Sequence, residues 1–171
     1  LNADVEEDTV SKSMSFDCAT LLSRLLRSSP SANLKASICR QLISNKSSQV
    51  HFAVLLPAVM ETFTQRSLYL KTYATVTLIN LSRGQDEVKN ALMKAGIGWM
   101  VMDNLKAHDD DLTHYSLVLL TNLTKHVHYR QMIFNNNSAL PSTLAGLLRT
   151  SAYVPSKQQI LAEVASLIGQ L

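Results

Sequence analysis

A phrase of eight residues returns in this chain after 42 residues. TLINLSRG, residues 77–84, places Asn80 within an apolar run, and LLTNLTKH, residues 119–126, does the same with Asn122 (122 minus 80 is 42). An amide in such a run is unusual because a buried polar group without a partner is costly. A chain that makes this exception twice at a fixed spacing is built from repeated structural units.

Each phrase ends a helix with two different faces, because residues advance by about 100° along a helix. One face, which we name the asparagine face, comprises Tyr69, Tyr73, Val76 and Asn80 in the first copy and Asp111, Tyr115, Val118 and Asn122 in the second. The other face is an apolar stripe made of Leu70, Ala74, Leu78 and Leu81, and then of Leu112, Ser116, Leu120 and Leu123. We expect the stripe to be buried and both amides to point away from it, so that replacing an asparagine costs little stability.

The same spacing relates other parts of the chain. KAGIGWMVMDNLKAH, after the first phrase, corresponds to NNNSALPSTLAGLLRTS after the second. A degenerate copy upstream contains ICRQLIS, with Gln41 in the asparagine position, and a partial copy downstream, KQQILAEVASLIGQL, has Ser166 there. A period of roughly 40 to 47 residues with two or three helices per unit is typical of helical solenoids. We predict an all-α, right-handed α-solenoid of about three repeats plus partial flanking units.

The repeat unit resembles the armadillo repeat, from Phe16 to the end of the chain. The resemblance is carried by a long helix ending in NLS or NLT, the short amphipathic segment EVKNALMKAGI and the second helix GWMVMDNL. It implies a concave groove lined by the third helix of each repeat, where the asparagine bonds the backbone of an extended peptide. Tyrosines on that face would add large contact areas with polar tips. The partner-binding residues that we expect are Gln41, Tyr69, Tyr73, Val76, Asn80, Tyr115, Val118 and Asn122.

Two branches of this family give different expectations. Nuclear-import adaptors carry tryptophan four residues before each asparagine, where this chain has Val76 and Val118, so recognition of nuclear signals is not expected. The phrases ALMKAGIGWMVMDNLK and LTHYSLVLLTNL are similar to the armadillo regions of ciliary proteins that also contain a LisH domain. That resemblance implies a protein-binding scaffold or adaptor in a ciliary or cytoskeletal assembly.

The composition is that of a folded chain, since 171 residues with 46% hydrophobic content can bury a core. No window reaches the roughly 18 apolar residues of a membrane span, so we expect a cytoplasmic protein. Residues 1–14 are acidic and predicted to be poorly ordered, and residues 15–171 are predicted to form the armadillo-repeat domain. We also expect a longer parent protein, because the chain begins with Leu1 and its last segment offers an apolar face without a following repeat: Ile160, Val164 and Leu167.

Positive charge is concentrated between Cys18 and Gln85, where eight basic residues oppose only Glu61, a sum of 8 minus 1, or +7. The basic residues are Arg24, Arg27, Lys35, Arg40, Lys46, Arg66, Lys71 and Arg83. They favour an acidic protein or peptide partner, unless they form only a solvated face. They also indicate an alternative function, charge-driven binding to an acidic surface such as microtubules or nucleic acid, although the segment lacks interleaved aromatics.

Other reactive features have structural interpretations, and we expect no catalytic residue, metal or cofactor. The acidic run at residues 109–111 suits a helix N-terminus, and the glycines at 96–98 suit a break between helices. His126 and His128 are interpreted as loop residues rather than a metal site. Trp99 and its neighbouring methionines are interpreted as core. Both cysteines are expected to be reduced structural thiols, and the chain is not expected to be an enzyme.

Overall fold

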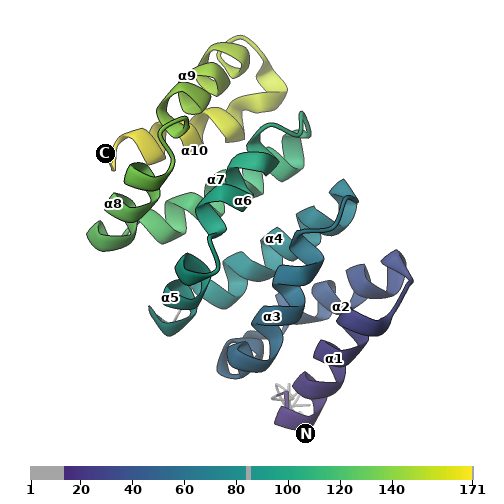
Figure 1. Ribbon diagram of the computed structural model, residues 1–171. Coiled ribbons are helices and arrows are strands. Elements are labelled where there is room, and N and C mark those ends of the chain that lie inside the picture. The colour runs from purple at the N-terminus through teal and green to yellow at the C-terminus, as the bar shows by residue number, and fades with distance from the viewer. Residues whose placement is uncertain (1–13, 84–85, 171) are drawn as a thin grey trace, which may run out of the picture.

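The computed structural model describes residues 14–83 and 86–170, and its helices form two layers that advance together along one axis (Figure 1). Every regular element in these two ranges is a helix, so the predicted all-α solenoid is confirmed. The elements in chain order are α1 (Phe16–Ser28), α2 (Ala32–Ser44), the 3-10 helix η1 (Lys46–His51), α3 (Phe52–Phe63), α4 (Leu68–Ser82), α5 (Asp86–Lys94), α6 (Ile97–Leu105), α7 (Asp110–Thr124), α8 (Val127–Asn136), α9 (Leu140–Ser151), the 3-10 helix η2 (Pro155–Lys157) and α10 (Gln158–Ile168).

One layer consists of α2, α4, α7 and α10, each packed against the next, and we call it the ladder layer. The outer layer consists of α1, α3, α6 and α9 (Figure 1). Here α3 packs on both α1 and α4, α6 packs on α7, and α9 packs on α10. The short helices η1, α5 and α8 lead from a ladder helix to the next outer helix. This order of short, outer and ladder helix is the repeat unit that the 42-residue spacing predicted.

Side chains that accept hydrogen bonds from backbone amides cap the N-termini of the long helices α4 and α7. The Ser67 hydroxyl accepts a 3.4 Å hydrogen bond from the Leu70 amide at the start of α4. The Asp109 carboxylate accepts one of 2.8 Å from the Leu112 amide at the start of α7, which confirms the N-cap interpretation of the acidic run. Gly96 separates α5 from α6 with a φ of 76°, a left-handed conformation that glycine adopts without strain.

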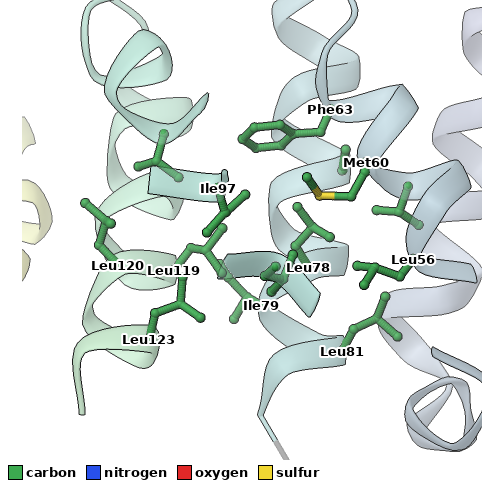
Figure 2. Packing of buried hydrophobic residues seen from close by; sticks show 14 of the residues in the cluster. Leu56, Met60, Phe63, Leu78, Ile79, Leu81, Ile97, Leu119, Leu120 and Leu123 are labelled. Carbon is green, nitrogen blue, oxygen red and sulfur yellow. The ribbon is translucent and has the colours of Figure 1, made fainter. Parts of the chain in front are cut away.

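The apolar stripe forms the core, as predicted. Leu78 and Leu120 are 0% and 1% exposed, and the other members of both stripes are also buried. Figure 2 shows side chains of α4 lying between those of α3 and α7: Leu78, Ile79 and Leu81 between Leu56, Met60 and Phe63 on one side and Leu119, Leu120 and Leu123 on the other. The ladder helix α4 therefore packs against both its own unit and the next one.

The flanking units are more complete than the sequence indicated. The residues Ile160, Val164 and Leu167 are buried, so the prediction of an uncovered face on the last segment is wrong. The reason is that α7 and α9 both pack on α10, which completes a unit made of α8, α9 and α10. The burial pattern of α10 places Ser166 in the position of Asn122, as expected, because Val164 and Leu167 match Leu120 and Leu123.

Two interpretations of single residues are wrong. Trp99 is 63% exposed rather than part of the core, because the buried stripe of α6 contains Ile97 and Val101, and position 99 points about 200° away from position 97. His128 is not in a loop, since α8 begins at Val127. His126 does precede the helix, and its Nε2 lies 3.1 Å from the buried Lys89 ammonium.

The acidic segment that we expected at residues 1–14 lies outside the described residues except for Met14. The side chain of Met14 is buried, and its carbonyl oxygen lies 2.7 Å from His51 Nε2. Within the described ranges, no helix is long and apolar enough to span a bilayer.

Candidate functional site

Asn80 lies half-buried at the boundary between α2 and α4. Its side-chain amide donates a 3.0 Å hydrogen bond to the Leu42 carbonyl on α2. Its own backbone carbonyl accepts a 2.8 Å bond from the Gln49 side chain of η1. Asn80 therefore ties two ladder helices and the short helix between their units.

Asn122 occupies the same place one unit later. Its amide donates a 2.7 Å hydrogen bond to the Ser82 hydroxyl of α4. Next to it, the Thr121 hydroxyl donates a 3.2 Å bond to Glu163 of α10. Both asparagines point away from the apolar stripe, but they are half-buried and bonded to the preceding ladder helix rather than exposed. The expectation that their replacement costs little stability must be corrected, because each removal breaks a contact between units.

A depression of about 540 Å³ on the ladder layer crosses α2, α4 and the start of α7. We call it the aromatic depression, and its lining consists of Arg40, Ile43, Tyr69, Thr72, Tyr73, Val76, Asp109, Asp111 and Tyr115. The Tyr69 and Tyr73 rings meet edge to face, with centroids 4.9 Å apart. Four residues of the predicted partner-binding set, Tyr69, Tyr73, Val76 and Tyr115, are thus brought together here.

Arg40 closes the α2 edge of the aromatic depression. Its guanidinium donates a 3.3 Å hydrogen bond to the Tyr69 hydroxyl and lies 5.2 Å from the centroid of the Tyr73 ring. The pKa of Arg40 is raised above its ordinary value, chiefly by the hydrogen bond to Tyr69. A guanidinium stacked on one tyrosine and bonded to another is held in one orientation, so it is a fixed positive charge at this edge.

A second depression, of about 160 Å³, lies one ladder step further along, among α4, α7 and α10. We call it the basic depression, and its lining consists of Ile79, Arg83, Val118, Thr121, Asn122, Lys125 and Glu163. Arg83 and Lys125 cap the C-terminal ends of α4 and α7, where positive charge complements the helix dipole. Val118 and Asn122 of the predicted set belong to this depression.

Gln41 lies apart from these two depressions. The burial pattern of α2 matches that of α4 at a spacing of 39 residues, since Cys39 and Leu42 correspond to Leu78 and Leu81 (78 minus 39 is 39). Gln41 therefore does occupy the position of Asn80, and it is exposed. It lines a third depression of about 390 Å³ between α1 and α2, together with Met14, Ser15, Cys18, Leu22, Leu42 and Asn45.

The predicted basic residues do not form one continuous patch. Arg27 is on the outer layer, where it pairs with Glu61 at 3.6 Å, whereas Arg40 belongs to the aromatic depression. Lys35 is only 7% exposed, because it lies on the buried side of α2 with Ala36 and Cys39. Lys71 lines a small hollow with Asp103 of α6. Arg24 is exposed on α1, and the Lys46 side chain lies outside the described residues.

Reasoning from the sequence missed part of the aromatic depression. Arg40 was assigned to the basic segment and Asp109 to helix capping, and neither was assigned to the partner-binding set. Asp111 did appear on the asparagine face, which was the available signal for a carboxylate there. In the two described ranges, no group of three or more His, Cys, Asp or Glu side chains is placed to hold a metal ion.

Comparisons with known proteins identify the class of fold. No protein-family model matches the sequence, and no curated protein matches it. A designed armadillo repeat protein in complex with the peptide (KR)4 has a TM-score of 0.74 at 15% identity, covering 90% of this chain and 64% of that one. An engineered protein has a TM-score of 0.73 at 17% identity, covering 90% and 62%. Another has a TM-score of 0.69 at 19% identity, covering 87% and 64%.

The chain therefore folds as an α-solenoid of armadillo-type repeats. It spans about three fifths of the length of these three structures. At these identities the likeness concerns the fold. The designed protein with its peptide shows that this fold can present a surface to a peptide.

Proposed function

We propose that the chain is a protein-binding scaffold that holds an extended peptide, or a partner helix, along the ladder layer. The observation that carries this proposal is the aromatic depression, where three tyrosines from two ladder helices gather in one concave surface. Tyrosines give large, rigid contact areas with a polar tip, which makes them frequent binding hot spots. The backbone of an extended peptide would lie across the ladder helices and place alternate side chains in the depressions.

The setting that we propose is a ciliary or cytoskeletal assembly. Its support is the similarity of ALMKAGIGWMVMDNLK and LTHYSLVLLTNL to ciliary LisH-domain armadillo proteins. The alternative of charge-driven binding has less support, because the basic residues of the N-terminal half lie on different surfaces and Lys35 is buried.

A display library of random peptides tests the proposal. Peptides of about twelve residues are long enough, when extended, to cross four ladder helices. We expect selected peptides to lose about tenfold or more in affinity for the Tyr69→Ala variant. Trp99→Ala is the matched control, because Trp99 is an exposed aromatic residue on the outer layer. Selected peptides that respond to Trp99→Ala and not to Tyr69→Ala would place binding on the other layer and contradict the proposal.

A further inference from the structure

The two depressions of the ladder layer have linings of opposite net charge. The aromatic depression contains Arg40 against Asp109 and Asp111, a sum of 1 minus 2, or −1. The basic depression contains Arg83 and Lys125 against Glu163, a sum of 2 minus 1, or +1. A partner that touches both depressions therefore meets a negative site and a positive site in a fixed order.

These charges are available to a partner. Among the described residues, neither Asp109 nor Asp111 forms an ion pair, whereas their neighbour Asp110 pairs with Lys157 at 2.7 Å. Arg83 and Lys125 likewise form no ion pair with other described residues, and both are exposed. Glu163 accepts the Thr121 hydroxyl and Asp109 accepts the Leu112 amide, so part of the negative charge of each is already engaged, whereas Asp111 is exposed.

The geometry gives a spacing between the two sites. Asp111 and Tyr115 of the aromatic depression lie near the start of α7, and Lys125 of the basic depression follows its end, 14 and 10 residues further along, which corresponds to about 15–21 Å of helix rise. Arg83 follows the end of α4, the neighbouring ladder helix, in the position that matches Lys125 (125 minus 83 is 42). A side chain between Arg83 and Lys125 is therefore about 18 Å from one beside Asp111 and Tyr115, which an extended chain covers in about five or six residues at ~3.3 Å each.

We propose that the ladder layer selects a peptide segment carrying one basic and one acidic residue about five or six positions apart. This inference rests on the proposed peptide-binding function and specifies its ligand. The basic side chain lies in the aromatic depression, against the Tyr115 ring and the Asp111 carboxylate. The acidic side chain lies between Arg83 and Lys125. Charges at the rim of an interface set register and partner choice, so the pair fixes how the segment sits.

Arg40 determines where in the aromatic depression a basic side chain binds. Its positive charge repels such a side chain, and its bond to Tyr69 and its position over the Tyr73 ring hold it at the α2 edge. A partner cation is therefore repelled from α2 and drawn toward α7, where the two carboxylates lie. The result is a cation site on the side of the depression that faces the basic depression.

The test uses peptides from the display library, sorted by charge pattern, and resynthesised with single changes of Arg to Gln or Asp to Asn. We expect enrichment of basic–acidic pairs at a spacing of about five or six residues, in one of the two orders. The Asp111→Asn variant should bind the parent peptide with roughly three- to fivefold lower affinity than the wild-type chain does. It should bind the peptide in which Arg is changed to Gln with unchanged affinity. The double variant Arg83→Gln with Lys125→Gln should likewise lower the affinity for the parent peptide and leave unchanged the affinity for the peptide in which Asp is changed to Asn. Asp111 is preferred to Asp109 for this test because Asp109 caps α7.

The matched control is the double variant Asp103→Asn with Lys106→Gln, which removes an exposed acid from α6 and an exposed base from the residue that follows it. Two results would overturn this inference and leave the proposed function standing. In the first, the peptides that depend on Tyr69 are uniformly basic. In the second, their affinity does not change with Asp111→Asn or with the Arg83 and Lys125 substitutions. A library that yields no peptide dependent on Tyr69 would overturn both.

Discussion

The side-chain amide of Asn80 donates a 3.0 Å hydrogen bond to the backbone carbonyl of Leu42, 38 residues earlier and one ladder helix away. The carbonyl lies in the last turn of α2. The asparagine thus supplies a donor to the end of the preceding ladder helix. Asn122 repeats the relation with Ser82, whose hydroxyl in turn donates to the Ile79 carbonyl at 3.1 Å.

We expect Asn80→Ala and Asn122→Ala each to lower the free energy of unfolding by about 1 to 2 kcal/mol, because each removes a half-buried hydrogen bond between ladder helices. Gln41→Ala is the control, since Gln41 has the equivalent position and is exposed, and it should change stability by less than about 0.5 kcal/mol. Urea unfolding of the three variants measures the differences. Equal stability of all three would mean that the asparagines act only on a partner.

The buried stripe gives a larger effect. Leu78→Ala and Leu120→Ala should each lower the free energy of unfolding by about 2 to 5 kcal/mol, because both leave a cavity in a tightly packed core. Leu21→Ala on α1 is the matched control, as that leucine is 56% exposed and fills no core position. Unfolding curves should separate the two classes clearly, and a comparable loss for Leu21→Ala would contradict the burial described for these leucines.

Two glycines in outer helices should respond in opposite directions to alanine. A Cβ at Gly98 would lie 2.8 Å from Nδ2 of Asn137, a buried side chain already bonded to the Ile133 carbonyl. Gly98→Ala should therefore destabilise the protein by about 1 to 3 kcal/mol. A Cβ at Gly146 meets nothing within 4 Å, so Gly146→Ala should stabilise α9 by about 0.5 to 1 kcal/mol. Denaturant midpoints measure both, and a Gly98→Ala variant as stable as Gly146→Ala would refute the contact with Asn137.

The pH dependence of stability should reveal the buried thiol of Cys39. Burial raises its pKa from 9.0 to about 11, against smaller lowering effects of Thr77 and Lys35. Between these two values the unfolded chain has lost the thiol proton and the folded chain retains it, so this contribution to stability is complete below pH 9 and falls as the pH rises toward 11. The total loss is roughly 2 to 3 kcal/mol.

The measurement compares the wild-type chain with Cys39→Ala over this pH range, because other groups also titrate there and cancel in the difference. The wild-type stability should fall more steeply than that of the variant. In the folded protein at mildly alkaline pH, an alkylating reagent should modify the exposed Cys18 and leave Cys39 unmodified. Parallel stability profiles, or rapid alkylation of Cys39, would show that the thiol is not buried as described.

Much of the fold could be predicted from the sequence, because helix periodicity and capping are local. The stripe containing Leu78 and Leu120 and the cap at Asp109 each depend on residues within a few turns of one another. The 42-residue return of the asparagine phrase then related two helices without any knowledge of their contacts. The same local signals placed Tyr69, Tyr73 and Val76 on one face, and these residues do line one depression.

What the sequence alone determined was therefore the repeat unit and the two faces of each long helix. Tertiary packing decided which side chains meet across helices: it placed Arg40 against Tyr69, bonded Asn80 to Leu42, left Trp99 exposed and buried Lys35. The spacing between matching buried positions is 39 residues from α2 to α4 and 42 from α4 to α7. Contacts between ladder helices depend on those offsets and on how the helices pack, and periodicity within one helix carries no information about either.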